Sequence, residues 1–478
     1  MQHLRSVLLL LLLLPAAMPA QNCSCSDELN FVVAYYERNL PGFKDNVTRR
    51  TRKSYQKRKA ELSALAKTTS ETTDCFKLLT YYVEFFKDNH SHISMSGAPV
   101  NESDPAALAA FKRSATFLHR ERIRVDPAAY RDRPLNDIEG IYQTKDSTYT
   151  IVIVPDRKGL REYVGVILES RTPLWEPGQV KMELRRKADQ PNTFEAFQYM
   201  RNHSLSYFNA LVLEDGRLGD SWFKTSLRVR HEFDLNLSAQ LEFRELDATT
   251  NYIRIHTFSG SQTAMIDTFY QHHDAQVRSK PRLIIDVRNN GGGNDGNAQQ
   301  LLKYIYTHPF RDDDVDVYVT RDNIKVFEEW YAFMSKDTVN VDPASARYMR
   351  DEIDRMKKQP EQSFMRRGNG DWVKLDTILQ WPAQVAIIVN NKCASSCESL
   401  LFWAKESKKT ILVGENSGGY VGYGEIGGVD TPCFGFRLGC TMTRYNRQRQ
   451  YEVVGIAPDY RLDRHSDWIE QTLRLLKK

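Results

Sequence analysis

Two serines lie between two cysteines where an apolar stretch passes into a helical pattern. In AIIVNNKCASSCESLLFWA, residues 386–404, Ser395 and Ser396 follow a predicted buried strand and precede a predicted helix. A nucleophilic serine must be exposed and rigidly held, and a strand-to-helix turn meets both needs while the helix N-terminus offers free N–H groups. Either serine is therefore a candidate nucleophile, with the next backbone N–H stabilising an oxyanion. The alternative is plain N-capping, for which serine is a preferred residue.

The second candidate is the glycine-rich turn in LIIDVRNNGGGNDGNAQQLL, residues 283–302, which also follows a predicted buried strand. Glycine lets the backbone approach a ligand closely. A phosphate loop is disfavoured because no Gly-Lys-Ser/Thr ending follows. A dinucleotide site is disfavoured because the GxGxxG match, Gly291 to Gly296, lacks the ribose-binding acid. A backbone N–H that donates to a reacting carbonyl fits this segment better.

Four motifs taken together resemble a known family. IIDVRNNGGG, CASSCES, GENSGG and YEVVGIAPD occur in the order and context of the carboxyl-terminal processing and tricorn-type serine peptidases. The resemblance spans residues 238–465 and a short piece at 86–95. It implies an α/β fold with a crotonase-like (ClpP/crotonase) catalytic core. The PDZ module that processing peptidases often carry has no evident counterpart in this sequence.

The resemblance also implies roles for single residues. Matching CASSCES to the family's serine motif through Glu398 makes Ser395 the nucleophile and gives Ser396 an oxyanion N–H. The glycine after the asparagine pair falls on Gly292, the likeness implying a second oxyanion donor there, and Gly291 stands where the family has proline.

The general base depends on the branch of the family. In the Ser-Lys branch a lysine follows the Gly-Glu motif, and here that position is Tyr420. A simple Ser-Lys dyad is therefore disfavoured, with Lys392 as its remaining candidate. The tricorn-like branch resembles a Ser-His-Glu set, which implies His90 of FKDNHSHIS as base and Glu452 of EVVGIAPD as its carboxylate. An imidazole takes the hydroxyl proton near neutral pH, and a carboxylate fixes its tautomer.

Neighbouring residues are accessory or substitute candidates. Asn89 is expected to orient the site or to bind substrate. Four other histidines remain as structural residues or substitutes for the base: His92, His256, His272 and His273.

The pattern of the remaining sequence divides the chain. Apolar residues at helical spacing predict three helices in an N-terminal region, residues 21–125, which contributes His90. Alternating apolar and polar residues predict an inserted small antiparallel β-domain at 134–232, a barrel or half-barrel. Apolar strands alternating with helices predict a mostly parallel sheet in the catalytic domain, 238–478. A charged, partly helical insertion is expected at 311–379.

The chain start has the features of an export signal. Residues 1–20 contain Arg5, an apolar run from Val7 to Leu14 and small residues up to Ala20, which is typical of a secretory signal peptide. No later stretch reaches eighteen apolar residues, so no transmembrane segment is expected in the mature chain. We therefore expect an exported protein, periplasmic or extracellular.

Charge and cysteine content limit the partners. The net charge of +5 is small and both signs are interleaved, which argues against nucleic-acid binding. Cysteines at zinc-ligand spacing are not evident, so no metal and no cofactor are expected. In an exported chain disulfides are permitted. The pairings considered are a hairpin bridge between Cys433 and Cys440 and a bond from Cys23 or Cys25 to Cys75. Cys393 and Cys397 are interpreted as small buried packing residues, with a redox switch beside the nucleophile as the alternative.

These observations predict an exported serine endopeptidase that hydrolyses polypeptides through an acyl-enzyme. The alternatives are a non-catalytic ligand-binding protein on the same fold, lipid- or retinoid-carrier-like, and a Ser-Lys dyad peptidase. The oligomeric state is not predicted by the sequence.

Overall fold

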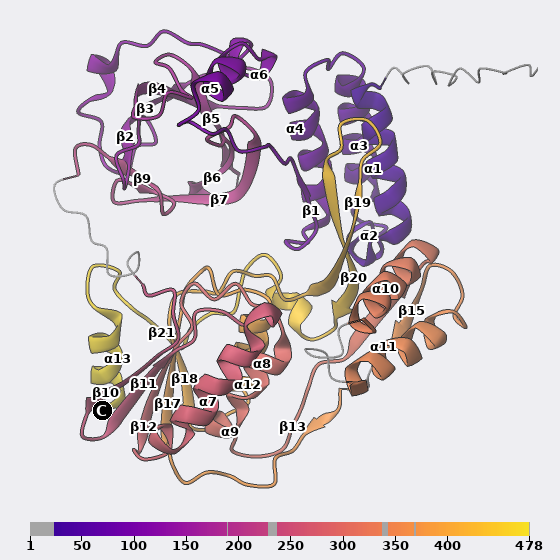
Figure 1. Cartoon of the computed structure of the whole chain (residues 1–478), viewed down its shortest axis with the longest axis vertical. Coiled ribbons are helices and arrows are strands. Elements are labelled where there is room, and N and C mark those ends of the chain that lie inside the picture. The colour runs from indigo at the N-terminus through magenta and orange to yellow at the C-terminus, as the bar shows by residue number, and fades with distance from the viewer. Residues whose placement is uncertain (1–22, 189, 228–236, 337–342, 368–369, 478) are drawn as a thin grey trace, which may run out of the picture.

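The computed structural model of the chain describes residues 23–188, 190–227, 237–336, 343–367 and 370–477. The predicted signal peptide, residues 1–20, lies outside these ranges. Within them the chain forms N-terminal helices, a closed β-barrel, a mostly parallel sheet and an antiparallel sheet (Figure 1). None of the described helices is long and apolar enough to cross a membrane.

The N-terminal part is helical, in agreement with its apolar spacing. Its elements are α1 (Cys25–Asn39), α2 (Pro41–Asn46), α3 (Arg52–Ala66), α4 (Thr72–Val83) and the 3₁₀ turn η1 (Glu84–Phe86). Lys87, in the left-handed conformation, ends η1, and β1 (His92–Ser94) follows. Three short helices then lead to the barrel: α5 (Pro105–Lys112), α6 (Ala115–Leu118) and η2 (Pro127–Tyr130). The predicted base His90 therefore lies between the helical region and a short strand.

The middle of the chain closes into an antiparallel barrel. Its strands are β2 (Gly140–Thr144), β3 (Tyr149–Pro155), β4 (Tyr163–Ser170), β5 (Val180–Lys187), β6 (Gln190–Tyr199), β7 (Leu205–Glu214), β8 (Arg217–Leu218) and β9 (Trp222–Lys224). Each strand pairs with the next, and β2 pairs with β9, so the sheet closes on itself. The sequence predicted a barrel or half-barrel at 134–232. Residues 228–232 of that range lie outside the described residues.

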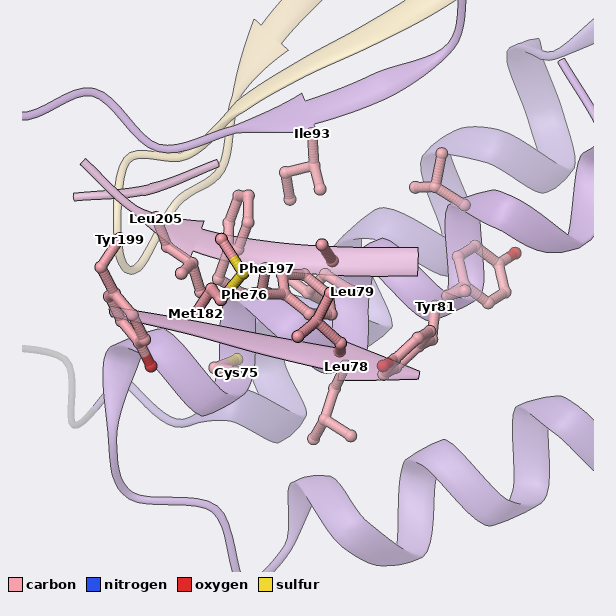
Figure 2. Packing of buried hydrophobic residues seen from close by; sticks show 14 of the residues in the cluster. Cys75, Phe76, Leu78, Leu79, Tyr81, Ile93, Met182, Phe197, Tyr199 and Leu205 are labelled. Carbon is pink, nitrogen blue, oxygen red and sulfur yellow. The ribbon is translucent and has the colours of Figure 1, made fainter. Parts of the chain in front are cut away.

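Helix α4 packs against the barrel and joins the two parts into one core. The rings of Phe76 and Tyr81 on α4 lie 6.4 and 5.4 Å from the ring of Phe197 on β6, centroid to centroid. Figure 2 shows this contact, with Ile93 of β1 above it. Each such buried side chain contributes about 1.5–3 kcal/mol through removal of apolar surface from water. The strand that follows His90 is thereby anchored to both the helices and the barrel.

The C-terminal half contains a six-stranded sheet with helices on both faces. In spatial order its strands are β10 (Glu242–Asp247), β11 (Thr250–Arg254), β12 (Arg282–Asp286), β17 (Gln384–Val389), β18 (Thr410–Gly414) and β21 (Tyr460–Arg461). Only β10 runs antiparallel to its neighbour. One face is covered by α7 (Thr263–Val277), α8 (Asp295–Gln299), α9 (Leu302–Ile305) and α12 (Ser396–Ala404), and the other by α13 (Trp468–Leu476). Alternate residues of β12, Ile285 and Ile284, enter the two different cores, as a strand buried on both faces requires.

A second, antiparallel sheet joins the C-terminal half to the N-terminal helices. It contains β1, β14 (Val315–Val319), β15 (Ser363–Arg366), β19 (Tyr423–Asp430) and β20 (Arg437–Tyr445). The hydroxyl of Tyr36 on α1 donates to the carbonyl of Gly439 on β20 at 2.6 Å. Figure 1 shows the β19–β20 hairpin lying along these helices.

The segment expected as an insertion, 311–379, is partly integrated into this sheet. Its helices α10 (Arg321–Met334) and α11 (Pro343–Met356) agree with the expected partly helical character. However, β14 pairs with β20, and β13 (Phe310–Arg311) pairs with β16 (Trp372–Val373). Strands this short carry too little alternation to be recognised from the sequence.

The cysteine pairing corrects one prediction. Cys433 bonds to Cys23, not to Cys440, which is a buried free thiol on β20. Cys25 bonds to Cys75, one of the two pairings considered. The third disulfide joins Cys393 to Cys397, so these residues are not simply small packing residues. Connectivity across 410 residues depends on the tertiary fold and cannot be deduced from spacing.

Candidate active site

Ser395 lies at the turn between β17 and α12, directly before the first helical residue. Its backbone has φ 56° and ψ −124°, a conformation that costs a residue with a Cβ about 1–3 kcal/mol. Two interactions hold the turn in this conformation. The N–H of Ser395 donates to Oε2 of Glu398 at 3.2 Å, and the Cys393–Cys397 disulfide closes the turn around the serine.

The glycine-rich turn after β12 lies against this serine. A Cβ on Gly292 would lie 2.5 Å from the carbonyl oxygen of Ala394 and 2.8 Å from the Cβ of Ser395. A Cβ on Gly293 would lie 2.3 Å from the carbonyl oxygen of Phe258. Both glycines have positive φ, 89° and 140°. Only glycine allows this loop to approach the serine so closely.

The N–H groups beside Ser395 differ from the predicted pair. The N–H of Gly292 donates to Oδ1 of Asn290 at 2.9 Å, so this group is engaged within its own loop and does not fit the role of oxyanion donor. Gly293 and Ser396 line the cavity that contains Ser395. Among the described residues, neither the N–H of Gly293 nor that of Ser396 has a hydrogen-bond acceptor.

His90 lies in a tight turn that Asp88 organises. Oδ1 of Asp88 accepts the N–H groups of His90 and Ser91, each at 3.1 Å. Its Oδ2 accepts the hydroxyls of Ser91 at 2.7 Å and of Thr441 at 2.6 Å. The turn is thus fixed both locally and to β20.

The His90 imidazole lies in the same cavity as Ser395. The ring of Tyr420 packs edge-on against it, with centroids 5.5 Å apart. Burial lowers the pKa of His90 below its ordinary value of 6.5, although the negative charges of Asp88 and Glu425 act to raise it. A neutral imidazole with negative charge nearby is suited to accept a proton and to bear the resulting positive charge.

Glu452 contacts the backbone around His90. Its Oε1 accepts the N–H of Asn89 at 2.8 Å, and its Oε2 accepts those of Val421 and Gly422 at 3.0 and 2.6 Å. Burial and the charge of Asp88 raise the pKa of Glu452, whereas the donated N–H groups lower it. Glu452 was expected to fix the tautomer of His90, but its hydrogen bonds among the described residues go to backbone N–H groups and not to the imidazole. These contacts suit a residue that positions the loop carrying His90.

Asn89 is held outside the Ser395 cavity. Its Nδ2 donates to the carbonyl of Gly419 at 2.8 Å, and its Oδ1 accepts from Nδ2 of Asn209 on barrel strand β7 at 3.1 Å. Of the two expected roles, orienting the site fits these contacts.

The cavity itself has a volume of about 460 Å³. In the residues that the structure describes, no lysine lines it, and Lys392 forms an ion pair with Asp220 of the barrel at 2.6 Å. None of the four substitute histidines, His92, His256, His272 and His273, lines it. Among the described residues, no group of three or more His, Cys, Asp or Glu side chains is arranged to hold a metal ion.

Several carboxylates of the site were not predicted as functional. Asp295 and Glu425 line the cavity, Asp88 organises the base turn, and Glu398 binds the N–H of Ser395. Single acidic residues carry no local pattern, and Asp295 in the first turn of a helix reads as an ordinary dipole-compensating residue. Asp88 and Glu398 lie within the motifs FKDNHSHIS and CASSCES, whereas Asp295 and Glu425 gave no signal.

The fold together with this serine and imidazole is that of a serine-type peptidase. Residues 249–462 match the model of peptidase family S41. This confirms the resemblance to carboxyl-terminal processing and tricorn-type serine peptidases that the motifs suggested. The matched range contains Ser395 and Glu452, whereas His90 lies upstream of it.

The chain is similar to several solved structures. Mature CPAF has a TM-score of 0.50 at 12% sequence identity, covering 95% of this chain and 97% of that chain. Mature CPAF complexed with lactacystin has a TM-score of 0.49 at 12% identity, with 95% and 98% covered. The photosystem II D1 C-terminal processing protease has a TM-score of 0.38 at 14% identity, with 95% and 98% covered. No curated protein matches the chain.

Proposed function

We propose that this chain is an exported endopeptidase that hydrolyses peptide bonds through an acyl-enzyme, with Ser395 as nucleophile and His90 as general base. The observation that carries the proposal is that Ser395, in its strained turn, and His90 line one cavity. Gly293 and Ser396 line it as well, and we assign their N–H groups as the donors to an oxyanion.

The proposed reaction proceeds in two halves. His90 accepts the hydroxyl proton of Ser395 as its oxygen attacks the substrate carbonyl, and the resulting oxyanion accepts hydrogen bonds from the N–H groups of Gly293 and Ser396. His90 then donates the proton to the leaving amine, which leaves an acyl group on Ser395. Water, deprotonated by His90, hydrolyses this ester. Glu452 completes the proposed Ser-His-Glu set by holding the Asn89 N–H and hence the base loop.

Two further features support export and a crotonase-like core. Three disulfides among the described residues suit an oxidising compartment, periplasmic or extracellular. The mostly parallel sheet, with its nucleophile at a strand-to-helix turn, suits a crotonase-like core with the barrel as an inserted domain.

A fluorophosphonate probe tests the nucleophile and the base. We expect labelling of the native protein at Ser395, none in Ser395→Ala, and labelling retained in Ser396→Ala, which keeps the backbone N–H. His90→Ala should label at least about 100-fold more slowly, given the usual contribution of general base catalysis. His272→Ala, at an exposed histidine that does not line the cavity, is the matched control. No labelling of the native protein would overturn the proposal in favour of a non-catalytic ligand-binding protein. Full labelling of His90→Ala would favour a Ser-Lys dyad.

A further inference from the structure

The cavity around Ser395 has an acidic lining. Two carboxylates, Asp295 and Glu425, line it, and no Lys or Arg is among its lining residues in the part of the chain that the structure describes. His90 is the histidine of the lining. Burial lowers the pKa of its imidazole, which therefore adds little positive charge near neutral pH.

Asp295 is the first residue of α8 and follows the glycine-rich turn that contains Gly293. Helix α8 packs against α12, so Asp295 lies near the start of the helix that follows the nucleophile. Burial raises the pKa of Asp295, and the hydroxyls of Ser396 and Ser399, which hydrogen-bond to the carboxyl, act to lower it. Among the described residues no cationic side chain pairs with Asp295. It is therefore a carboxylate in the cavity with neutral partners only.

Glu425 shares its counter-ion with another carboxylate. Arg367 pairs with Glu425 on β19, and its Nε also binds the buried Glu352 on α11 at 2.6 Å. One guanidinium thus serves two carboxylates. The negative charges of Glu425 and, to a lesser extent, of Asp295 also raise the pKa of Tyr445, which lines the same cavity. Asp295, Glu425 and Glu352 are thus three carboxylates with one guanidinium, that of Arg367, between them.

We propose that this cavity selects peptides that carry a Lys or Arg side chain next to the scissile bond, with Asp295 as the counter-ion of that side chain. This proposal rests on the peptidase function proposed above. A volume of about 460 Å³ is within the range of ligand pockets and accommodates an extended basic side chain. A neutral side chain would cover Asp295 without pairing it, and burying an uncompensated charge is costly. A guanidinium or ammonium would replace the lost water with a charge-assisted hydrogen bond.

Peptides that differ only in charge test this selection. A peptide with arginine beside the cleaved bond and its citrulline counterpart have nearly the same shape, and the residue is placed on either side of the bond in turn. For the native enzyme we expect kcat/KM to favour arginine at one of these positions by about tenfold or more, the size expected for a charge-assisted bond. In Asp295→Asn this preference should fall to below about threefold. Asp430→Asn removes an exposed carboxylate at the far end of β19 and should keep the preference.

Binding without turnover separates this proposal from the peptidase function. Ser395→Ala protein is titrated with the arginine and the citrulline peptides by calorimetry. Tighter binding of the arginine peptide that is lost in Ser395→Ala/Asp295→Asn supports the cation site, even if the native protein cleaves nothing. Equal binding of the two peptides, or cleavage by the native enzyme without preference for arginine, would overturn the cation site and leave the peptidase function standing.

Discussion

Glu398 and Glu452 bind consecutive N–H groups of one loop. Glu398 accepts the N–H groups of Gly419 and Tyr420 at 2.8 and 2.7 Å, and Glu452 accepts those of the next two residues, Val421 and Gly422. Each carboxylate also holds the backbone beside a proposed catalytic group, Glu398 at Ser395 itself and Glu452 one residue before His90. The loop therefore sets the position of the nucleophile relative to the base.

Replacement of Glu398 by glutamine should loosen this link. Each carboxylate oxygen of Glu398 accepts two hydrogen bonds. In either orientation of the glutamine side chain, its NH₂ group therefore faces two donors, at least one of which is a backbone N–H. An unsatisfied buried donor costs about 1–3 kcal/mol. We expect Glu398→Gln to lower kcat about 10- to 100-fold with little change in KM, and to lower the melting temperature.

Steady-state kinetics and thermal unfolding measure these effects. The control is Glu406→Gln, which removes a partly exposed carboxylate paired with Arg447 just beyond α12. It should leave kcat unchanged. A native kcat in Glu398→Gln would contradict the positioning role.

The pH dependence of kcat/KM should report the titration of His90. Because burial lowers the pKa of His90, the imidazole remains neutral to lower pH than an exposed histidine, so the acid limb should have its midpoint below 6.5. The charge of Glu425 acts to raise this pKa. Glu425→Gln removes that charge and should therefore move the midpoint to still lower pH. The profile of Asp430→Asn, altered at the exposed end of the same strand, should match the native one. An upward shift in Glu425→Gln would show that another group controls the limb.

The sequence predicted two residues that the structure brings together, but not the residues that support them. Ser395 and His90 were predicted from ordered motifs, and both line one cavity. Gly292 was predicted as an oxyanion donor, yet its N–H is taken by Asn290, a bond that depends on the exact shape of the loop. Asp295 was not recognised, because its importance comes from the missing counter-ion, which is a property of the assembled cavity.

The fold was predictable to a similar extent. Apolar strands such as β12 and β17 stand out because they are buried on both faces. The antiparallel sheet was missed because its strands come from distant segments: β1 pairs with β20 across more than 300 residues of chain. No local periodicity of apolar residues predicts such a pairing.

The strained conformation of Ser395 should be measurable as stability. Glycine adopts positive φ readily, whereas alanine keeps the Cβ that makes this conformation costly. Both Ser395→Gly and Ser395→Ala should be inactive, but the glycine variant should have the higher free energy of unfolding, by about 1 kcal/mol. Denaturant unfolding of the two proteins compares them. Equal stabilities, or a more stable alanine variant, would mean that the turn is not strained in solution.

The Cys393–Cys397 disulfide should matter more for activity than for global stability. It closes a loop with a separation of 4 residues around Ser395, whereas Cys25–Cys75 closes one of 50 and neither of its cysteines lines the cavity. On loop entropy alone the two bonds contribute about 2 and about 4 kcal/mol. Cys393→Ala/Cys397→Ala should therefore lose about tenfold in kcat with the smaller loss of stability, because a small shift of a nucleophile is costly. Cys25→Ala/Cys75→Ala should show the reverse pattern. Kinetics with and without dithiothreitol complete the test. Reductant should lower the kcat of the native enzyme toward that of Cys393→Ala/Cys397→Ala and leave the kcat of that variant unchanged. A native kcat in Cys393→Ala/Cys397→Ala would show that the disulfide does not hold the serine.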